Sequence, residues 1–119
     1  MTKVAIFLLS GVEDSHRTAA FHALLYARDL KAANIDVQLV FDGAGSAWID
    51  EWSKPENRTH KLYEEVRDSG IIAGVCDFCV GHFGDKAKAS GQGLSLLGGS
   101  GGHPDISRFV GQGYQVIVI

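Results

Sequence analysis

Two cysteines, Cys76 and Cys79, are the only cysteines of the chain and lie three residues apart in the stretch GVCDFCVGHFG, residues 74–84. A cysteine thiolate is a nucleophile and a metal ligand, and two neighbouring thiols form a disulfide. In a reducing compartment such a pair is more typical of free thiols than of a structural disulfide. A third use is plain packing, because free cysteine is among the most buried residue types.

A metal-binding interpretation rests on the series formed by Cys76, Cys79 and His82. A fourth ligand, His60 or His103, becomes available only if folding brings one of them near. Structural zinc sites usually take their ligands from two separated pairs, and this sequence has no second pair. We therefore expect no metal site.

Short apolar runs and helical patterns alternate along the chain, and these elements must position the cysteines. Runs rich in valine and isoleucine predict strands at 3–9, 35–41, 71–75 and 114–119, with a short fifth strand at 94–97. Their lack of polar alternation indicates strands covered on both faces. Three helices are predicted. The first follows a cap at Asp14 or Ser15, the second spans residues 59–69, and the third begins at about Pro104. The region 85–103 is crowded with glycines, and its stretch GGSGGHPD, residues 98–105, is expected to be a flexible loop.

This alternation predicts a three-layer α/β sandwich with a mainly parallel sheet of about five strands, in a single domain spanning residues 1–119. Ligands of open α/β sheets bind beyond the carboxyl ends of the strands. Those ends are residues 10–14, 42–45, 76–79 and 98–103. The candidate ligand-binding residues there are Ser10, Asp42, Gly43 and His103.

Cys76 is expected to leave the third strand and begin a helix, where backbone N–H groups stabilise a thiolate. Asp77 acts in the opposite sense, because a nearby carboxylate raises a thiol pKa. Cys76 and Cys79 are thus the candidate catalytic pair, with structural packing as the alternative.

The charge pattern and the known motifs exclude several classes of partner. The net charge is −3 and basic residues form no run, so we expect no nucleic-acid partner and no membrane partner. The apolar run 4–9 is too short to span a bilayer and lacks the flanks of a secretion signal, which predicts a cytoplasmic protein. Neither a P-loop nor a dinucleotide-binding glycine motif follows any predicted strand, and we expect no cofactor.

The sequence resembles the DsrE/DsrF-like family of small sulfur-relay proteins, in a less characterised branch. The similar stretches are residues 11–45, LYEEVRDSGIIAGVCDFCVGHFG at 62–84, and GHPDISRFVGQGYQVIVI at 102–119. The resemblance implies a parallel-sheet sandwich that assembles into oligomers and exchanges sulfur with donor and acceptor proteins. It also implies that Cys76, eight residues before Gly84, carries a persulfide, with Cys79 as a second thiol that resolves it or forms a disulfide.

Two functions follow from these observations. The first is a persulfide carrier or thiol-redox protein that uses Cys76 with Cys79. The alternative is a non-catalytic module that binds a small ligand or a partner and keeps its cysteines as structural residues, as the acidic segment 11–14 and the glycine-rich loop before Pro104 indicate. For a homo-oligomer, Trp48, Trp52 and Leu25 are the expected interface residues.

Overall fold

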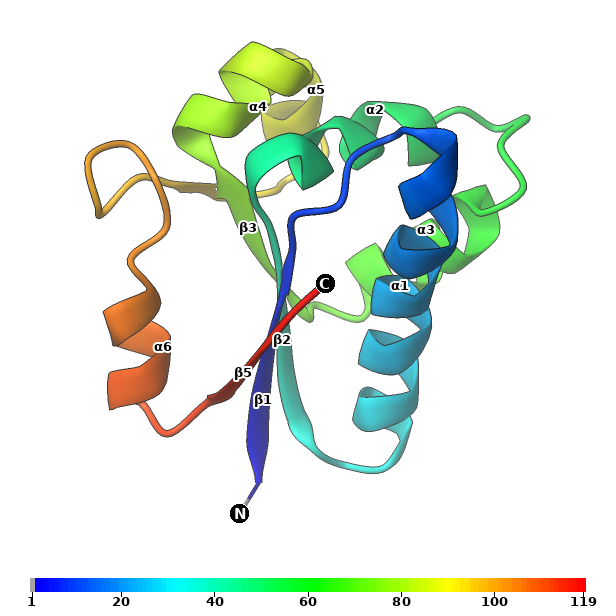
Figure 1. Ribbon diagram of the computed structural model, residues 1–119. Helices are drawn as coiled ribbons and strands as arrows, with labels where there is room; N and C mark the ends of the chain where they lie inside the picture. The colour runs from blue at the N-terminus through cyan, green and yellow to red at the C-terminus, as the bar shows by residue number, and fades with distance from the viewer. Residues whose placement is uncertain (1) are drawn as a thin grey trace.

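The computed structural model describes residues 2–119, and its core is a five-stranded sheet in the order β4-β3-β2-β1-β5. Every pair of neighbouring strands in this sheet is parallel (Figure 1). This confirms the predicted three-layer α/β sandwich, and the sheet is wholly rather than mainly parallel. The strands are β1 (Lys3–Leu8), β2 (Asp36–Phe41), β3 (Ile72–Cys76), β4 (Leu96–Leu97) and β5 (Gln115–Val118).

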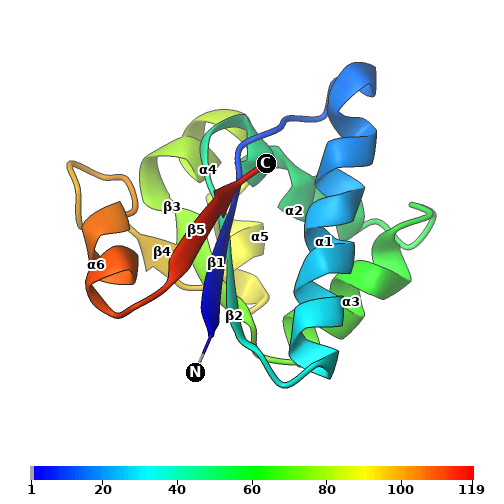
Figure 2. The ribbon, with the colours of Figure 1, turned by 60° about the horizontal axis from the view of Figure 1, so that its bottom comes forward.

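Helices cover the two faces of the sheet unequally, as Figure 2 shows. On one face lie α1 (Arg17–Ala32) and α3 (His60–Asp68), and on the other lies α6 (Ile106–Gly111). Above the carboxyl ends of the strands lie three short helices and a 3₁₀ turn: η2 (Gly43–Ala47), α2 (Trp48–Trp52), α4 (Asp77–Phe83) and α5 (Lys86–Gly91). A second 3₁₀ turn, η1 (Asp14–His16), precedes α1. None of these helices is long and apolar enough to cross a membrane.

The larger hydrophobic cluster lies between the sheet and the α1–α3 layer. Trp48 and Trp52 stack within it at a ring separation of 4.8 Å, and Trp52 also contacts Phe41 and Tyr63. Both tryptophans are almost completely buried in the chain's own core. Their assignment to an oligomer interface was therefore wrong, because α2 turns its apolar face inward. Leu25 of α1 is half-buried.

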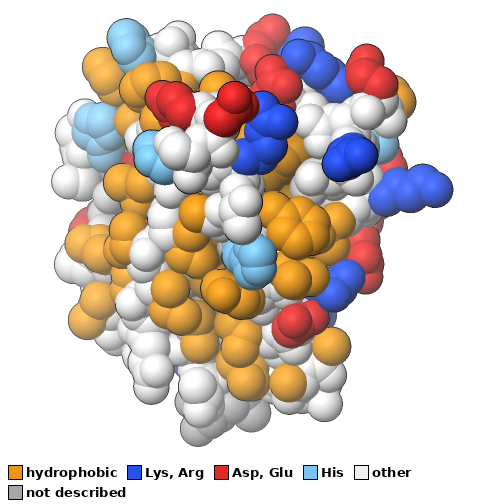
Figure 3. Space-filling view, turned by 45° about the vertical axis from the view of Figure 1, so that its right-hand side comes forward, with side chains coloured by type: hydrophobic (Ala, Val, Ile, Leu, Met, Phe, Trp, Pro, Cys, Tyr) orange, Lys and Arg blue, Asp and Glu red, His pale blue; other side chains and the backbone are white. Residues whose placement is uncertain are grey.

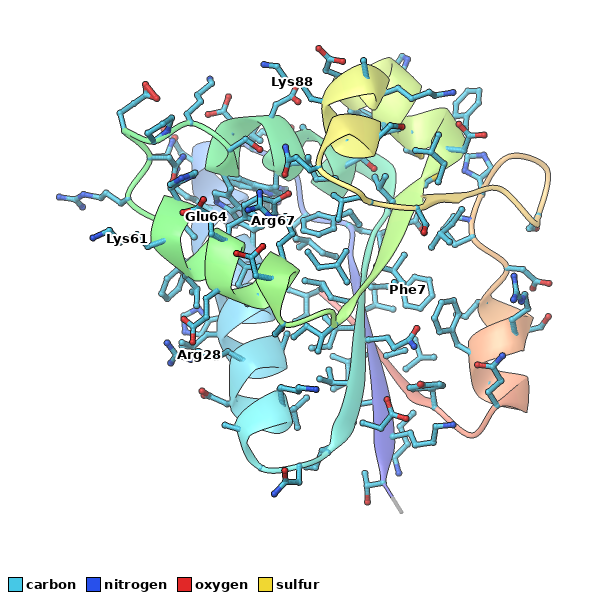
Figure 4. The ribbon with its side chains drawn as sticks, turned by 180° about the vertical axis from the view of Figure 1, so that it is seen from behind. Phe7, Arg28, Lys61, Glu64, Arg67 and Lys88 are labelled. Carbon is cyan, nitrogen blue, oxygen red and sulfur yellow. The ribbon has the colours of Figure 1, made fainter. Side chains whose placement is uncertain are left out.

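A smaller cluster lies on the opposite face, under α6. Phe7 of β1 projects from the sheet toward this side, where Phe109 of α6 meets it edge-on at 5.2 Å between ring centroids (Figure 4). One short helix cannot cover all five strands, and part of this face next to β3 and β4 is left hollow.

The structure differs from the sequence predictions at three helices. Neither Asp14 nor Ser15 caps α1, because both lie in η1, and Asp14 instead pairs with Arg17 at 2.6 Å. The last helix begins at Ile106, with Asp105 rather than Pro104 at its start. Region 85–103 contains a helix that was not predicted, α5, which follows a cap formed by Asp85.

Candidate functional site

Four polar side chains meet at the carboxyl edge of the sheet and form what we call the four-residue cluster: Asp42, Cys76, Cys79 and His103. One ligand-capable atom of each lies within 4.8 Å of those of the others. Asp42 directly follows β2, Cys76 ends β3, Cys79 lies in α4, and His103 closes the loop after β4. Because β2, β3 and β4 are neighbours in the sheet, their ends bring these residues together.

The two cysteines lie on either side of the junction between β3 and α4. Cys76 occupies the N-cap position of α4, and the backbone N–H of Cys79 donates to its Sγ at 3.4 Å. Both are free thiols. Cys76 is completely buried and Cys79 is 7% exposed, so neither sulfur is freely accessible from solvent.

His103 separates the thiols from solvent. Its Nδ1 lies 3.1 Å from Cys76 Sγ and 3.7 Å from Cys79 Sγ. The ring also packs against Phe78, whose side chain is exposed, at 5.1 Å between centroids. Since His103 is itself an exposed residue, it connects the buried sulfur atoms to the surface.

The loop that carries His103, residues 98–103, covers the thiols and is called here the cap loop. The N–H of Phe78 donates to the Gly102 carbonyl at 3.0 Å, and the N–H of Ser100 donates to the His103 carbonyl at 2.8 Å. The Cys76 thiol also points at the Gly102 carbonyl, at 3.7 Å. The Phe78–Gly102 bond thus ties this glycine-rich loop to α4 over the site, and the Ser100–His103 bond closes the loop on itself.

Asp42 is held in place by its own turn. Its Oδ1 accepts a hydrogen bond from the N–H of Gly43 at 2.8 Å, and the residue is half-buried. The turn packs tightly on β1, because a Cβ at Gly45 would lie 2.1 Å from the carbonyl oxygen of Leu8. Only glycine fits there, and this contact fixes where the Asp42 carboxylate stands.

The environment of Cys76 disfavours its thiolate. Burial, above all, raises the pKa of Cys76 to about 12, and the Cys79 thiol and the Asp42 carboxylate act in the same direction. The Cys79 N–H lowers this pKa but does not outweigh burial. The backbone N–H at the strand–helix junction therefore acts in the expected direction, but burial leaves the pKa of Cys76 raised rather than lowered. Asp77 is not the carboxylate responsible, since its Oδ1 is paired with Lys86 Nζ at 2.6 Å.

Of the four predicted ligand-binding residues, Asp42 and His103 join the cysteines in the cluster. Gly43 contributes the N–H that orients Asp42. Ser10 is not part of the cluster, and its carbonyl accepts a hydrogen bond from Trp48 Nε1 at 2.8 Å.

Neither of the other histidines considered as metal ligands belongs to the cluster. His82 is exposed on α4 and packs edge-on against Phe83. His60 Nδ1 lies 2.6 Å from the Trp52 carbonyl, and its Nε2 lies 3.2 Å from Glu64. Sequence reasoning missed that Asp42 and His103 meet the thiols themselves, although the position of each directly beyond a strand was the available signal.

A separate cavity of about 430 Å³ lies on the α6 face of the sheet. Its polar lining includes Gln38, Asp105, Arg108 and Gln112, and Gly98 and Gly99 of the cap loop form part of its wall. None of the predicted site residues lines it. The cap loop is thus shared between the cavity and the four-residue cluster.

Comparison with known proteins supports the fold. No family model matches the sequence. An uncharacterized protein of Methanocaldococcus jannaschii is 26% identical over 117 residues, which are 97% of this chain and 93% of that protein. The structure of a conserved protein of unknown function from Bacteroides thetaiotaomicron superposes with a TM-score of 0.63 at 17% identity, over 97% of this chain and 94% of that one. This likeness extends over nearly the whole chain and concerns the fold alone.

Proposed function

We propose that this protein is a thiol-based sulfur carrier in which Cys76 holds a persulfide and Cys79 serves as the second thiol. The observation that carries the proposal is the convergence of both sulfur atoms on one imidazole, at 3.1 Å and 3.7 Å from His103 Nδ1. An imidazole at hydrogen-bond distance is the usual activator of a cysteine nucleophile. The resemblance to the DsrE/DsrF-like family points to the same cysteine.

The loading step needs only the residues of the cluster and a persulfide donor. His103 Nδ1 accepts the proton of Cys76, which gives the buried thiol a route to its thiolate. The Cys76 thiolate attacks the outer sulfur of the donor persulfide, so that one S–S bond forms and the donor S–S bond breaks. The donor leaves as a thiolate and takes back the proton from the imidazolium, which leaves the protein as a Cys76 persulfide.

Delivery follows by either of two routes. In the first, the thiolate of an acceptor attacks the outer sulfur and releases Cys76 as a thiol. In the second, the Cys79 thiolate attacks Cys76 Sγ, expels hydrosulfide and forms the Cys76–Cys79 disulfide, which an external dithiol then reduces. The proximity of the two sulfur atoms supports the second route.

Access to the sulfur requires the cap loop to open, because Cys76 is completely buried. The backbone hydrogen bond from the Phe78 N–H to the Gly102 carbonyl, which joins the loop to α4, is the contact that must break. Loop opening of this kind is a common step in enzymes that shield a reactive group from water.

The proposal is tested on the reduced, metal-free protein by intact-mass spectrometry after incubation with a low-molecular-weight persulfide donor. We expect the chain to gain the mass of one sulfur atom, and to lose it again when an acceptor thiol is added. No adduct under conditions in which unfolded protein is fully modified would rule out the carrier function.

A second candidate function is favoured by the burial of both sulfur atoms, namely a ligand- or partner-binding module with structural cysteines. The cavity of about 430 Å³ supports it, with Arg108 as its basic residue. The same experiment separates the two functions. Thiols that resist both the donor and alkylating reagents in the folded protein would favour this second function.

We also infer a homo-oligomer, as the family resemblance implies, and a reducing, cytoplasmic setting, which the sequence pattern predicts. Ile117 and Val118 of β5 are 42% and 62% exposed, and β5 is an edge strand. Figure 3 shows hydrophobic side chains gathered in a band on the molecule's α1 side. Exposed apolar edges favour pairing with a second copy. Light scattering is expected to give a multiple of 12.8 kDa, and a monomer at working concentration would contradict this inference.

A further inference from the structure

We propose that Asp42, Cys76, Cys79 and His103 form a binding site for one thiophilic divalent cation, with Zn²⁺ as the expected ion. The inference goes beyond sulfur transfer and does not depend on it. It rests on the presence of four metal-ligating atoms, from four separate positions in the chain, within 4.8 Å of one another.

Two of the separations between these atoms are close to those of tetrahedral coordination. Zn–S bonds of about 2.3 Å and Zn–N or Zn–O bonds of about 2.0–2.1 Å imply ligand-to-ligand distances of about 3.3–3.8 Å in a tetrahedron. The two sulfur atoms lie 3.1 Å and 3.7 Å from His103 Nδ1. These two separations fall within a few tenths of an ångström of the tetrahedral values, and all four ligand atoms lie within 4.8 Å of one another, so a cation would enter as the remaining ligands draw in.

The kinds of donor atom select the ion. Two sulfur atoms and one imidazole nitrogen form a borderline-soft set, which favours Zn²⁺ over Mg²⁺ or Ca²⁺. The carboxylate of Asp42 completes the set as an oxygen ligand. Three of the four ligands are anionic once the thiols lose their protons, so a divalent cation leaves the site with a formal charge of −1.

The local charges also favour a cation. The half-buried Asp42 carboxylate lies beside two buried thiols, so its negative charge repels a thiolate. A cation bound between these groups would replace that repulsion with attraction to each of them. The nearby cation Lys86 is already engaged by Asp77. Within residues 2–119, no lysine or arginine forms an ion pair with Asp42.

The ligands are oriented by neighbouring groups, as in built metal sites. The N–H of Gly43 holds the Asp42 carboxylate, and the N–H of Cys79 donates to Cys76 Sγ. His103 approaches the thiols through Nδ1 from the exposed cap loop. Opening of that loop would admit the ion without disturbing the sheet.

The expectation of no metal site relied on the lack of a second ligand pair in the sequence. The fold supplies that pair from two distant segments, Asp42 after β2 and His103 after β4. His82, which completes the local C-x-x-C-x-x-H series, is exposed on α4 and is not one of the four. A substitution of His82 is therefore the matched control for substitutions of His103.

The test uses the reduced full-length protein, first freed of metal, and Co²⁺ as a spectroscopic probe. We expect one Co²⁺ per chain, a sulfur-to-cobalt charge-transfer band and strong d–d bands of four-coordinate cobalt, all lost when one equivalent of Zn²⁺ is added. Asp42→Ala, its conservative partner Asp42→Asn, and His103→Ala should each weaken binding at least about tenfold. His82→Ala should bind Co²⁺ as the unaltered protein does, and circular dichroism checks that each variant is folded.

Two results would overturn the proposal. One is the absence of any sulfur-to-cobalt band in the folded protein. The other is unchanged binding in both the Asp42→Asn and His103→Ala variants, which would mean that the thiols alone hold the ion. Because sulfur loading is measured on metal-free protein, failure of cation binding leaves that result untouched, and the converse also holds.

Discussion

Replacing Cys76 with serine is expected to abolish persulfide formation completely, whereas replacing Cys79 with serine should leave the added sulfur in place. Only the Cys76 sulfur lies at 3.1 Å from His103 Nδ1, and the serine hydroxyl is far too weak an acid to replace it. Cys79→Ser should retain the persulfide for longer than the unaltered protein, because the thiol that would expel it as hydrosulfide is gone. Intact-mass spectra of both variants with the same donor measure this difference.

The two serine variants are matched controls for each other. Each replaces one buried or nearly buried thiol with a hydroxyl of similar shape, beside the same histidine. We expect each to change the free energy of unfolding by only about 1 kcal/mol. An adduct that survives Cys76→Ser, or that vanishes equally in both folded variants, would contradict the assignment of Cys76 as the carrier.

Substituting Gly45 with alanine is expected to lower the free energy of unfolding by about 3 kcal/mol or more. The new methyl group would lie 2.1 Å from the Leu8 carbonyl oxygen and 2.8 Å from its carbonyl carbon. Because both are backbone atoms of a central strand, no side chain can rotate away to relieve the clash. Either η2 moves off β1 or the register of the sheet is disturbed.

Gly91→Ala is the control for this prediction. Gly91 ends α5, is exposed, and has no atom within 4 Å of an added methyl group. Alanine there should leave stability unchanged or raise it by up to about 1 kcal/mol. Urea denaturation of both variants compares the two effects, and a Gly45→Ala protein as stable as Gly91→Ala would show that η2 does not pack on β1 as described.

Gly45 also connects stability to the site. The turn that it packs onto β1 carries Asp42, so a displaced η2 moves the carboxylate away from the sulfur atoms. In a Gly45→Ala protein that keeps part of its structure, we therefore expect cobalt binding to be weakened more than persulfide formation on Cys76. This difference follows because Cys76 and Cys79 belong to β3 and α4 and not to the turn.

Much of the architecture could be predicted from the sequence because buried parallel strands leave a local signal. The run from Ile35 to Phe41 has only two polar residues, Asp36 and Gln38, and it forms β2 at the centre of the sheet. Helix α5 was not predicted, because the many glycines that follow it obscured both its cap, Asp85, and the short helix-forming segment after that cap. Tertiary packing of Ala89, which is completely buried, stabilises that short helix.

The site was predictable residue by residue but not as a unit. Asp42, Cys76 and His103 each follow a strand, which marks them as candidates without showing which strands are neighbours. Only the order β4-β3-β2 brings them together. The direction of the Cys76 pKa could not be predicted from the strand–helix junction, because burial of this sulfur depends on its three-dimensional surroundings, including the cap loop from a distant part of the chain.

Whether sulfur is carried on Cys76 is measured most directly by locating the added atom in the unaltered protein. Reduced, metal-free protein is treated with the persulfide donor, alkylated and digested, and the peptide containing both cysteines is fragmented. We predict the extra sulfur on Cys76, with Cys79 alkylated as an ordinary thiol. An extra sulfur on Cys79 alone, or on neither cysteine, would contradict the claim.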